Sequence, residues 1–261
     1  MPPDDETAPA PDSAVSGQFI GSPNFGERRG GKAPSILLLH YTGMETAAAA
    51  LLRLCDPLAE VSAHYLIFEN GRTVQLVREA ARAWHAGIGC WADEADINSA
   101  SVGIEIANPG HAGGLPDFPD AQIGSVIALC RDISARHAIL PSRVLAHSDI
   151  APARKVDPGE KFPWDVLADA GIGHYVPPAP VKRGRGLSPG DDGAAVRVWQ
   201  SMLGAYGYGI EETGQFDAQT QTVTAAFQRH FRPALIDGIA DHSTIATLDR
   251  LLKALAPAAV S

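Results

Sequence analysis

The chain has 261 residues, which is enough for one sizeable hydrophobic core and a smaller second module. Its net charge of −9 argues against a nucleic-acid partner, because binding to a phosphate backbone requires a basic surface. The one basic cluster, VKRGRG at 181–186, is short, and we interpret it as a solvated spacer.

The cysteines and the apolar runs bear on the compartment. Cys55, Cys90 and Cys130 are odd in number and form no CxxC pair, so they indicate neither a disulfide framework nor a thiolate zinc site. This pattern fits a reducing compartment. No 18 apolar residues run together, so no membrane span is expected. Residues 1–17 are acidic and rich in Pro and Ala, and we expect them to be disordered, with no signal peptide.

Strand and helix signals then alternate along the first two thirds of the chain. We predict a buried strand at 35–40, a helix at 45–54, a hairpin at 62–77, a strand at 101–107, a helix at 120–137 and a strand at 142–147. The dipeptide Asn70-Gly71 is the strongest hairpin signal among them. This order predicts an α/β domain at 18–173, with a mixed central β-sheet flanked by helices.

Hydrophobic periodicity stops in the Pro- and Gly-rich stretch 174–186, which we predict to be a linker. Three amphipathic helical patterns follow within 187–256. We therefore expect a small C-terminal three-helix domain.

Two histidines end predicted buried strands, and an aspartate follows. His40 closes ILLLH, His147 closes RVLAH, and Asp157 lies ten residues further on. Two imidazoles and a carboxylate are a plausible ligand set for a catalytic zinc ion, with a fourth position left for water. For His40 alone, the alternative is a core or surface histidine.

Two further charged residues are candidates for chemistry. Glu105 is a carboxylate on the otherwise apolar strand VGIEIA, and it is either an outward-facing strand residue or a base. Lys155 precedes Asp157 by two residues, so in an extended segment both side chains point the same way. Lys155 then forms a salt bridge or faces a substrate carbonyl.

Five motifs occur together over residues 18–170. They are HYTG at 40–43, VSAHYLI at 61–67, RAWHAG at 82–87, SVGIEIANPG at 101–110 and AHSDIAPARKVDPGEKFPW at 146–164. In this order they resemble the zinc-dependent N-acetylmuramoyl-L-alanine amidases of the AmpD/AmiD type. The resemblance implies the mixed-sheet fold shared with peptidoglycan-recognition proteins.

The resemblance also implies site roles. His40, His147 and Asp157 would be the Zn²⁺ ligands, Glu105 the general base, and Lys155 the group that stabilises the tetrahedral intermediate. The implied reaction is hydrolysis of the amide between the lactyl group of N-acetylmuramic acid and L-alanine, in cell-wall turnover and recycling. Asp149 is then interpreted as a supporting group rather than a ligand.

Other residues of these motifs are candidates for substrate binding. They are Tyr41, His64, Trp84, His85 and Asn108. For His64 the alternative is a buried hydrogen-bonded residue, and for Trp84 and His85 it is local packing. The remaining histidines, among them His230, are interpreted as structural or exposed.

The C-terminal module resembles a peptidoglycan-binding domain of the three-helix type. Val196, Trp199 and Leu203 would form its core face, so Trp199 is interpreted as a core residue rather than a platform for sugar. Whether the module binds wall polymer stays open.

Alternative functions stay open as well. The main rival is a non-catalytic protein that binds muropeptide; a zinc peptidase is disfavoured because no HExxH motif occurs. The expected partners are peptidoglycan or an anhydro-muropeptide, with no obligate protein partner. We expect a cytoplasmic enzyme of recycling; the alternative is a periplasmic amidase acting on intact wall, towards which the C-terminal module points.

Overall fold

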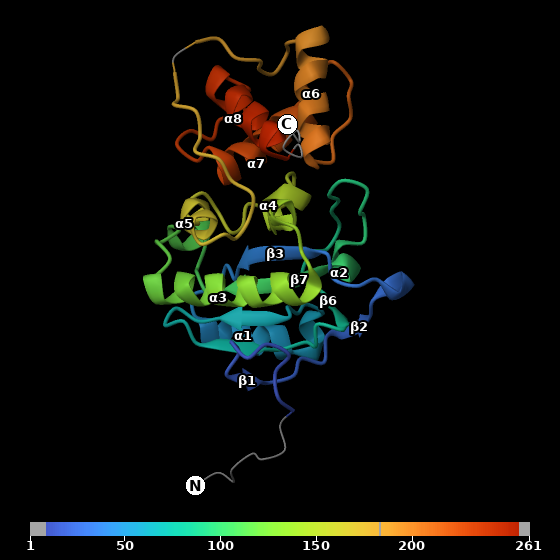
Figure 1. Ribbon diagram of the computed structural model, residues 1–261, viewed down its shortest axis with the longest axis vertical. Helices are drawn as coiled ribbons and strands as arrows, with labels where there is room; N and C mark the ends of the chain where they lie inside the picture. The colour runs from blue at the N-terminus through green and yellow to red at the C-terminus, as the bar shows by residue number, and fades with distance from the viewer. Residues whose placement is uncertain (1–8, 183, 256–261) are drawn as a thin grey trace, which may run out of the picture. The chain divides into compact units, whose positions relative to one another are not determined.

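The computed structural model describes residues 9–182 and 184–255. The chain divides into two compact units (Figure 1). Of the described residues, the first unit holds 9–87 and 98–140, and the second holds 88–97, 141–182 and 184–255.

The main sheet has six strands in the order β1-β5-β4-β7-β3-β8. Their bounds are β1 Gln18–Phe19, β3 Ile36–Tyr41, β4 Tyr65–Ile67, β5 Thr73–Gln75, β7 Ser101–Ile106 and β8 Val144–Ala146. Strand β7 pairs in parallel with both β3 and β4, whereas β4 and β5 are antiparallel. The sheet is therefore mixed, as the sequence predicts.

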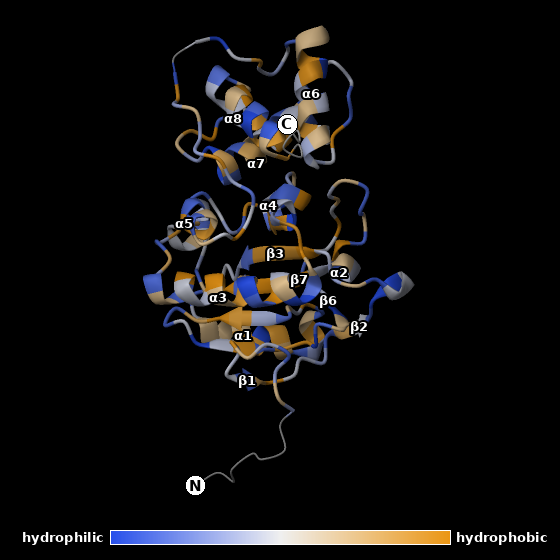
Figure 2. Ribbon diagram, in the orientation of Figure 1, coloured by the Kyte–Doolittle hydropathy of each residue, from blue (hydrophilic) through white to orange (hydrophobic). Residues whose placement is uncertain are grey.

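The first unit is built around β3. Residues Ile36 to Leu39 are fully buried, and such a continuous apolar run is typical of a parallel strand covered on both faces. In Figure 2 the strands of the sheet are drawn mainly in the colour of hydrophobic residues. Helix α3 (Asp120–His137) packs against β4 and buries Ile123, Val126 and Ile133.

Shorter elements complete this unit. Helix α1 (Ala47–Cys55) begins at Thr46, whose side chain accepts a hydrogen bond from the Ala49 amide. Strands β2 (Phe25–Glu27) and β6 (Ala81–Ala83) form a separate two-stranded sheet. Helix α2 (Ile97–Ala100) precedes β7.

The second unit carries the short helices α4 (His147–Ile150) and α5 (Trp164–Asp169) and the three longer helices of the C-terminal module. These are α6 (Ala194–Tyr206), α7 (Ala218–Phe231) and α8 (His242–Leu255). Trp199 is 1% exposed and its indole N–H donates to Thr224 Oγ1 at 2.9 Å. The interpretation of Trp199 as a core residue is therefore confirmed.

Two segments differ from expectation. Disorder was expected through residue 17; residues 1–8 lie outside the described part. The carboxylate of Asp12, however, accepts hydrogen bonds from Gln75 Nε2, Arg78 Nη1 and the Glu79 amide, and Ser13 and Ser16 are buried. The prediction of disorder is therefore wrong for residues 12–16, because these contacts compensate the entropy lost on ordering the chain.

The predicted linker lacks helices and strands over its described residues, but it is not a free spacer. The Ala179 amide donates to Thr247 Oγ1 at 3.0 Å, and Ser243 Oγ donates to the Ala179 carbonyl at 2.5 Å. The segment therefore packs on α8.

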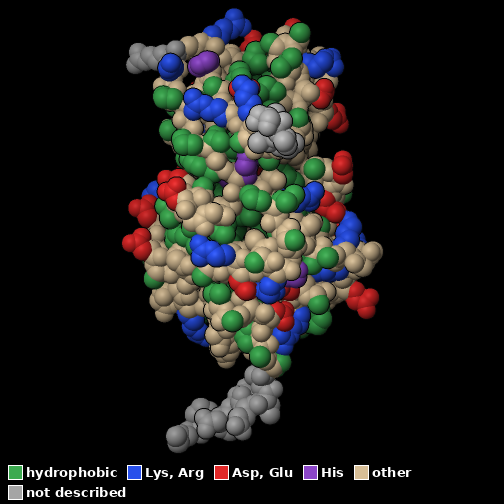
Figure 3. All heavy atoms as spheres, viewed as in Figure 1, with side chains coloured by type: hydrophobic (Ala, Val, Ile, Leu, Met, Phe, Trp, Pro, Cys, Tyr) green, Lys and Arg blue, Asp and Glu red, His purple; other side chains and the backbone are tan. Residues whose placement is uncertain are grey.

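Two further observations concern membranes and charged partners. Among the described residues, no helix combines the length and hydropathy needed to cross a bilayer. On the face drawn in Figure 3, basic and acidic side chains are interspersed rather than gathered by sign.

Candidate metal centre

His40 and Glu105 lie side by side on the sheet. His40 is the fifth residue of β3, and its Cα partner on the parallel strand β7 is Glu105. Side chains of in-register partners on neighbouring strands project from the same face. His40 is 1% exposed, whereas Glu105 is half-buried. The pairing sets a carboxylate next to a buried imidazole.

The ring of His85 lies within hydrogen-bond distance of one ring nitrogen of His40, Nε2. His40 Nε2 lies 3.0 Å from His85 Nδ1, and His85 Nε2 lies 3.3 Å from Ser101 Oγ. Gly103 makes room for this ring, because a Cβ at Gly103 would lie 2.4 Å from His85 Cγ. Ser101, Gly103 and Glu105 alternate along β7 and so share one face.

Two proton arrangements satisfy this chain of hydrogen bonds. In one, Ser101 donates to His85 and His85 donates to His40, which leaves the proton of His40 on Nδ1. In the other, His40 donates to His85 and His85 donates to Ser101. Only the second leaves a lone pair on His40 Nδ1, and a metal ligand requires this lone pair.

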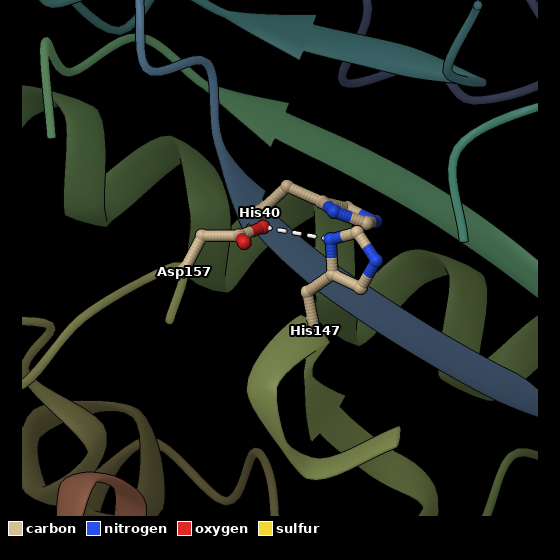
Figure 4. A group of neighbouring side chains, drawn as sticks. All are labelled: His40, His147 and Asp157. Atoms are coloured by element: carbon tan, nitrogen blue, oxygen red, sulfur yellow. Dashed lines mark hydrogen bonds and ion pairs between the residues drawn. The ribbon is translucent and has the colours of Figure 1, made fainter. Parts of the chain in front are cut away.

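His147 and Asp157 approach each other within the second unit. His147 is the first residue of α4, directly after β8, and both side chains are buried. His147 Nδ1 and Asp157 Oδ2 are 2.9 Å apart (Figure 4). The Ser148 amide also donates to the Asp157 carbonyl at 3.0 Å, which ties the two segments together.

The three predicted ligands form one group. One ligand atom each from His40, His147 and Asp157 lies within 4.8 Å of the others (Figure 4). Ligands bonded to a tetrahedral zinc ion at about 2.0–2.2 Å stand about 3.3–3.6 Å apart. Two imidazoles and a carboxylate at these separations can hold a metal ion.

A turn directly precedes the segment from Lys155 to Asp157. The amides of both Arg154 and Lys155 donate to the Ala151 carbonyl at 3.0 Å, so the chain forms a turn here. This turn ends at Lys155 and does not cover 155–157, so the direction of the Lys155 side chain and its role stay predictions.

Three of the predicted substrate-binding residues have contacts within the protein that the structure describes. The Asn108 side chain is buried, donates to the Pro116 carbonyl and accepts from the Gly110 amide, so it shapes the 108–116 loop. Trp84 lies near Gly26 of β2, with its backbone amide on Ser62 Oγ.

His64 is the third of these residues. It is fully buried; its Nδ1 accepts the Gly103 amide at 2.9 Å and its Nε2 lies 3.2 Å from the Ala81 carbonyl. Burial and the nearby Arg28 guanidinium lower the pKa of His64 to about 3, so the ring is neutral. The buried, hydrogen-bonded alternative is the one the structure supports.

Tyr41 and His85 are the two other predicted substrate-binding residues, and they have different contacts. Tyr41 is half-buried, and its hydroxyl lies 3.0 Å from His111 Nδ1. Its ring leaves no room for a Cβ at Gly110, where the two would stand 2.6 Å apart. His85 contacts the predicted metal ligand His40, and its contact with substrate stays a prediction.

Two residues of β7 were missed by sequence reasoning. Ser101 and Gly103 hold and accommodate the His85 ring. A glycine inside a strand pattern is a signal for close approach by another group, and Gly103 carried that signal.

Comparisons with known proteins give matches over both parts of the chain. A family model described as N-acetylmuramoyl-L-alanine amidase matches residues 30–160, and a peptidoglycan binding domain model matches residues 192–248. N-acetylmuramoyl-L-alanine amidase AmiD of Escherichia coli (strain K12) is 39% identical over 233 residues, covering 84% of this chain and 82% of that protein.

Two solved structures are similar over most of the chain. One is E. coli AmiD in complex with the substrate anhydro-N-acetylmuramic acid-L-Ala-D-γ-Glu-L-Lys, with a TM-score of 0.74 and 35% identity, covering 89% of this chain and 98% of that one. The other is AmpDh3 of Pseudomonas aeruginosa in complex with an anhydromuramic pentapeptide, with a TM-score of 0.72 and 32% identity, covering 88% and 95%. Because the amidase model spans half of the chain and AmiD is similar across most of both proteins, this protein belongs to the N-acetylmuramoyl-L-alanine amidase family.

Proposed function

We propose that this protein hydrolyses the amide bond between the lactyl group of N-acetylmuramic acid, or its 1,6-anhydro form, and the L-alanine of peptidoglycan fragments, and that its metal is zinc. The observation that carries this proposal is the convergence of His40, His147 and Asp157 next to the strand that bears Glu105. A catalytic zinc ion is usually held by three protein ligands, commonly histidine nitrogens and carboxylates.

The chemistry divides between the metal and the side chains. When bound there, zinc supplies a Lewis acid for the scissile carbonyl and increases the acidity of water at the site. Glu105 accepts the proton of the attacking water and returns it to the departing nitrogen of L-alanine. The carbon–nitrogen bond breaks, leaving a carboxylate on the lactyl group and a free amine on the peptide.

Supporting residues prepare this step. His85 accepts the proton of His40 Nε2 in the arrangement that leaves a lone pair on His40 Nδ1 for the metal. Lys155 is proposed to face the oxyanion of the tetrahedral intermediate, where a positive charge lowers the barrier. This role is carried over from the family motif alone.

The substrate source is the finer part of the proposal. In it, residues 18–173 form the catalytic domain, 174–186 a linker and 187–256 a wall-binding module. The free cysteines Cys55, Cys90 and Cys130 support a cytoplasmic enzyme acting on anhydro-muropeptides. The peptidoglycan-binding match at 192–248 favours the alternative, a periplasmic enzyme acting on intact wall.

One assay, run with both substrates, tests the amidase activity and its dependence on the metal. The purified protein is incubated with intact sacculi and, separately, with anhydro-muropeptide, each with and without a chelator, and the products are identified by mass. We expect free stem peptide beginning with L-alanine, and its loss with the chelator. Peptide release from neither substrate would refute the amidase activity, and release that survives complete zinc removal would refute the metal mechanism.

A further inference from the structure

A buried carboxylate joins the metal-ligand segment to the helical module. Asp149, on α4, is fully buried. Its Oδ2 accepts the Ala146 amide at 2.8 Å and His230 Nδ1 at 2.7 Å. Its Oδ1 accepts the Tyr208 hydroxyl at 2.7 Å. Every one of these bonds lies within the second unit.

Both side-chain donors come from the C-terminal module. Tyr208 follows α6 and is 3% exposed, and burial and then the charge of Asp149 raise its pKa well above the usual value, so it is a neutral donor. His230 lies on α7, which packs against α4, and it is also buried. The His230 ring stacks on Trp164 at 3.7 Å, which fixes its plane.

Asp149 is also hydrogen-bonded to the backbone beside the predicted metal ligand His147. Ala146 directly precedes His147, so the bond from its amide to Asp149 fixes the backbone from which the His147 ring projects. The next residue, Ser148, donates to the Asp157 carbonyl. A buried carboxylate is stable only while its hydrogen bonds are satisfied. Loss of a donor from the module therefore disturbs the turn that carries His147.

We propose that Tyr208 and His230 are positioning residues for the metal ligand His147, acting through Asp149. The helical module is then a structural support of the metal centre in addition to any binding of wall polymer. This inference rests on the proposed metal site, and it goes beyond a catalytic domain and a binding domain that act separately.

The test uses full-length protein and measures zinc affinity by competition with a chromophoric chelator. Tyr208→Phe removes only the hydroxyl, and His230→Leu removes the Nδ1 donor. His230→Asn keeps an N–H donor near the place of Nδ1. Removing a hydrogen-bond partner of a metal ligand typically weakens metal binding by about 10–100-fold. Because these residues act through Asp149, we expect a loss of about tenfold for Tyr208→Phe and His230→Leu, with partial rescue in His230→Asn.

The control is Thr224→Val, which removes a buried hydroxyl from the same module. Thr224 Oγ1 accepts from Trp199 and has no bond to Asp149. We expect it to lower thermal stability while zinc affinity stays at the wild-type value. If Tyr208→Phe and His230→Leu bind zinc as tightly as Thr224→Val does, the inference is wrong. Because affinity is measured without substrate, a failure of the amidase assay would leave this result interpretable.

Discussion

At the scale of single residues, the orientation of His40 depends on a neighbour 45 positions away in the sequence. His85 Nδ1 lies 3.0 Å from His40 Nε2, and Ser101 holds the other side of the His85 ring. In the arrangement where His40 Nε2 donates its proton to His85, His40 Nδ1 keeps the lone pair that a metal ligand requires.

Substitution of His85 tests this dependence. His85→Leu removes the acceptor, and we expect zinc affinity to fall by about 10–100-fold. His85→Asn retains an oxygen acceptor close to the position of Nδ1, so we expect it to recover most of that loss. Chelator competition measures both variants, and urea unfolding shows that each is folded. Equal zinc affinity in the Leu and Asn variants would contradict the role of this hydrogen bond.

The sequence predicted the residues of the centre better than their supports. His40 and His147 stand at the ends of buried strands, and Asp157 follows in a motif, so local pattern and resemblance sufficed. The contacts of His64 and His85 depend instead on which strands become neighbours in the sheet. No local periodicity carries that information.

At the scale of elements, strand β7 bears the predicted base Glu105 and also packs closely against the ring of His85. The strand is buried except at Glu105, and Gly103 stands beneath the His85 ring. A side chain at position 103 would overlap that ring, because a Cβ there would lie 2.4 Å from its atoms.

Gly103→Ala is therefore expected to be harmful. Overpacking of this kind costs about 1–3 kcal/mol, and displacement of His85 would weaken zinc binding as well. The matched control is Gly124→Ala on α3, where a Cβ meets nothing within 4 Å and a helical alanine gains about 0.5–1 kcal/mol. Urea unfolding of both variants gives the comparison; an unchanged or increased stability for Gly103→Ala would be incompatible with the packing described.

Elements with a strong local pattern were predicted correctly. The hairpin around Asn70-Gly71 appears as β4 and β5, and the helix at 120–137 is α3. Strands β1, β2 and β6 have only two or three residues and were not predicted, since such runs show no clear alternation. The single turn α4 also escaped prediction, and its Asp149 carboxylate accepts the N-terminal Ala146 amide.

At the scale of the whole molecule, the modules are linked more closely than the sequence suggested. The stretch 174–186 reads as a spacer, yet Ala179 is bonded to α8, and Asp149 is bonded to residues of α7 and the segment after α6. Contacts between residues more than fifty positions apart are set by tertiary packing, which a pattern of prolines cannot show.

Global stability should depend on pH through His64. Burial and Arg28 lower its folded-state pKa to about 3, against about 6.5 in the unfolded chain. Between these values the unfolded chain binds the extra proton, so stability is fully present above pH 6.5 and is lost as pH falls towards 3. The slope contributed is at most about 1.4 kcal/mol per pH unit.

Comparison with His64→Asn isolates this effect. Both proteins are unfolded with urea between pH 7 and pH 4, with a chelator present so that metal binding does not contribute. We expect the wild type to lose about 1–3 kcal/mol more than the variant over this range. Parallel pH profiles for the two proteins would show that His64 does not titrate as described.

The central claim is that Glu105 acts on water beside a metal held by His40, His147 and Asp157. The most direct measurement is the zinc content and the turnover of Glu105→Gln, with His147→Ala prepared alongside. We predict that Glu105→Gln binds one zinc ion per chain, as the wild type does, but loses turnover by at least about 100-fold, since a general base typically contributes about 10²–10⁴. His147→Ala should lose the metal. A Glu105→Gln variant that cleaves at the wild-type rate would contradict the account.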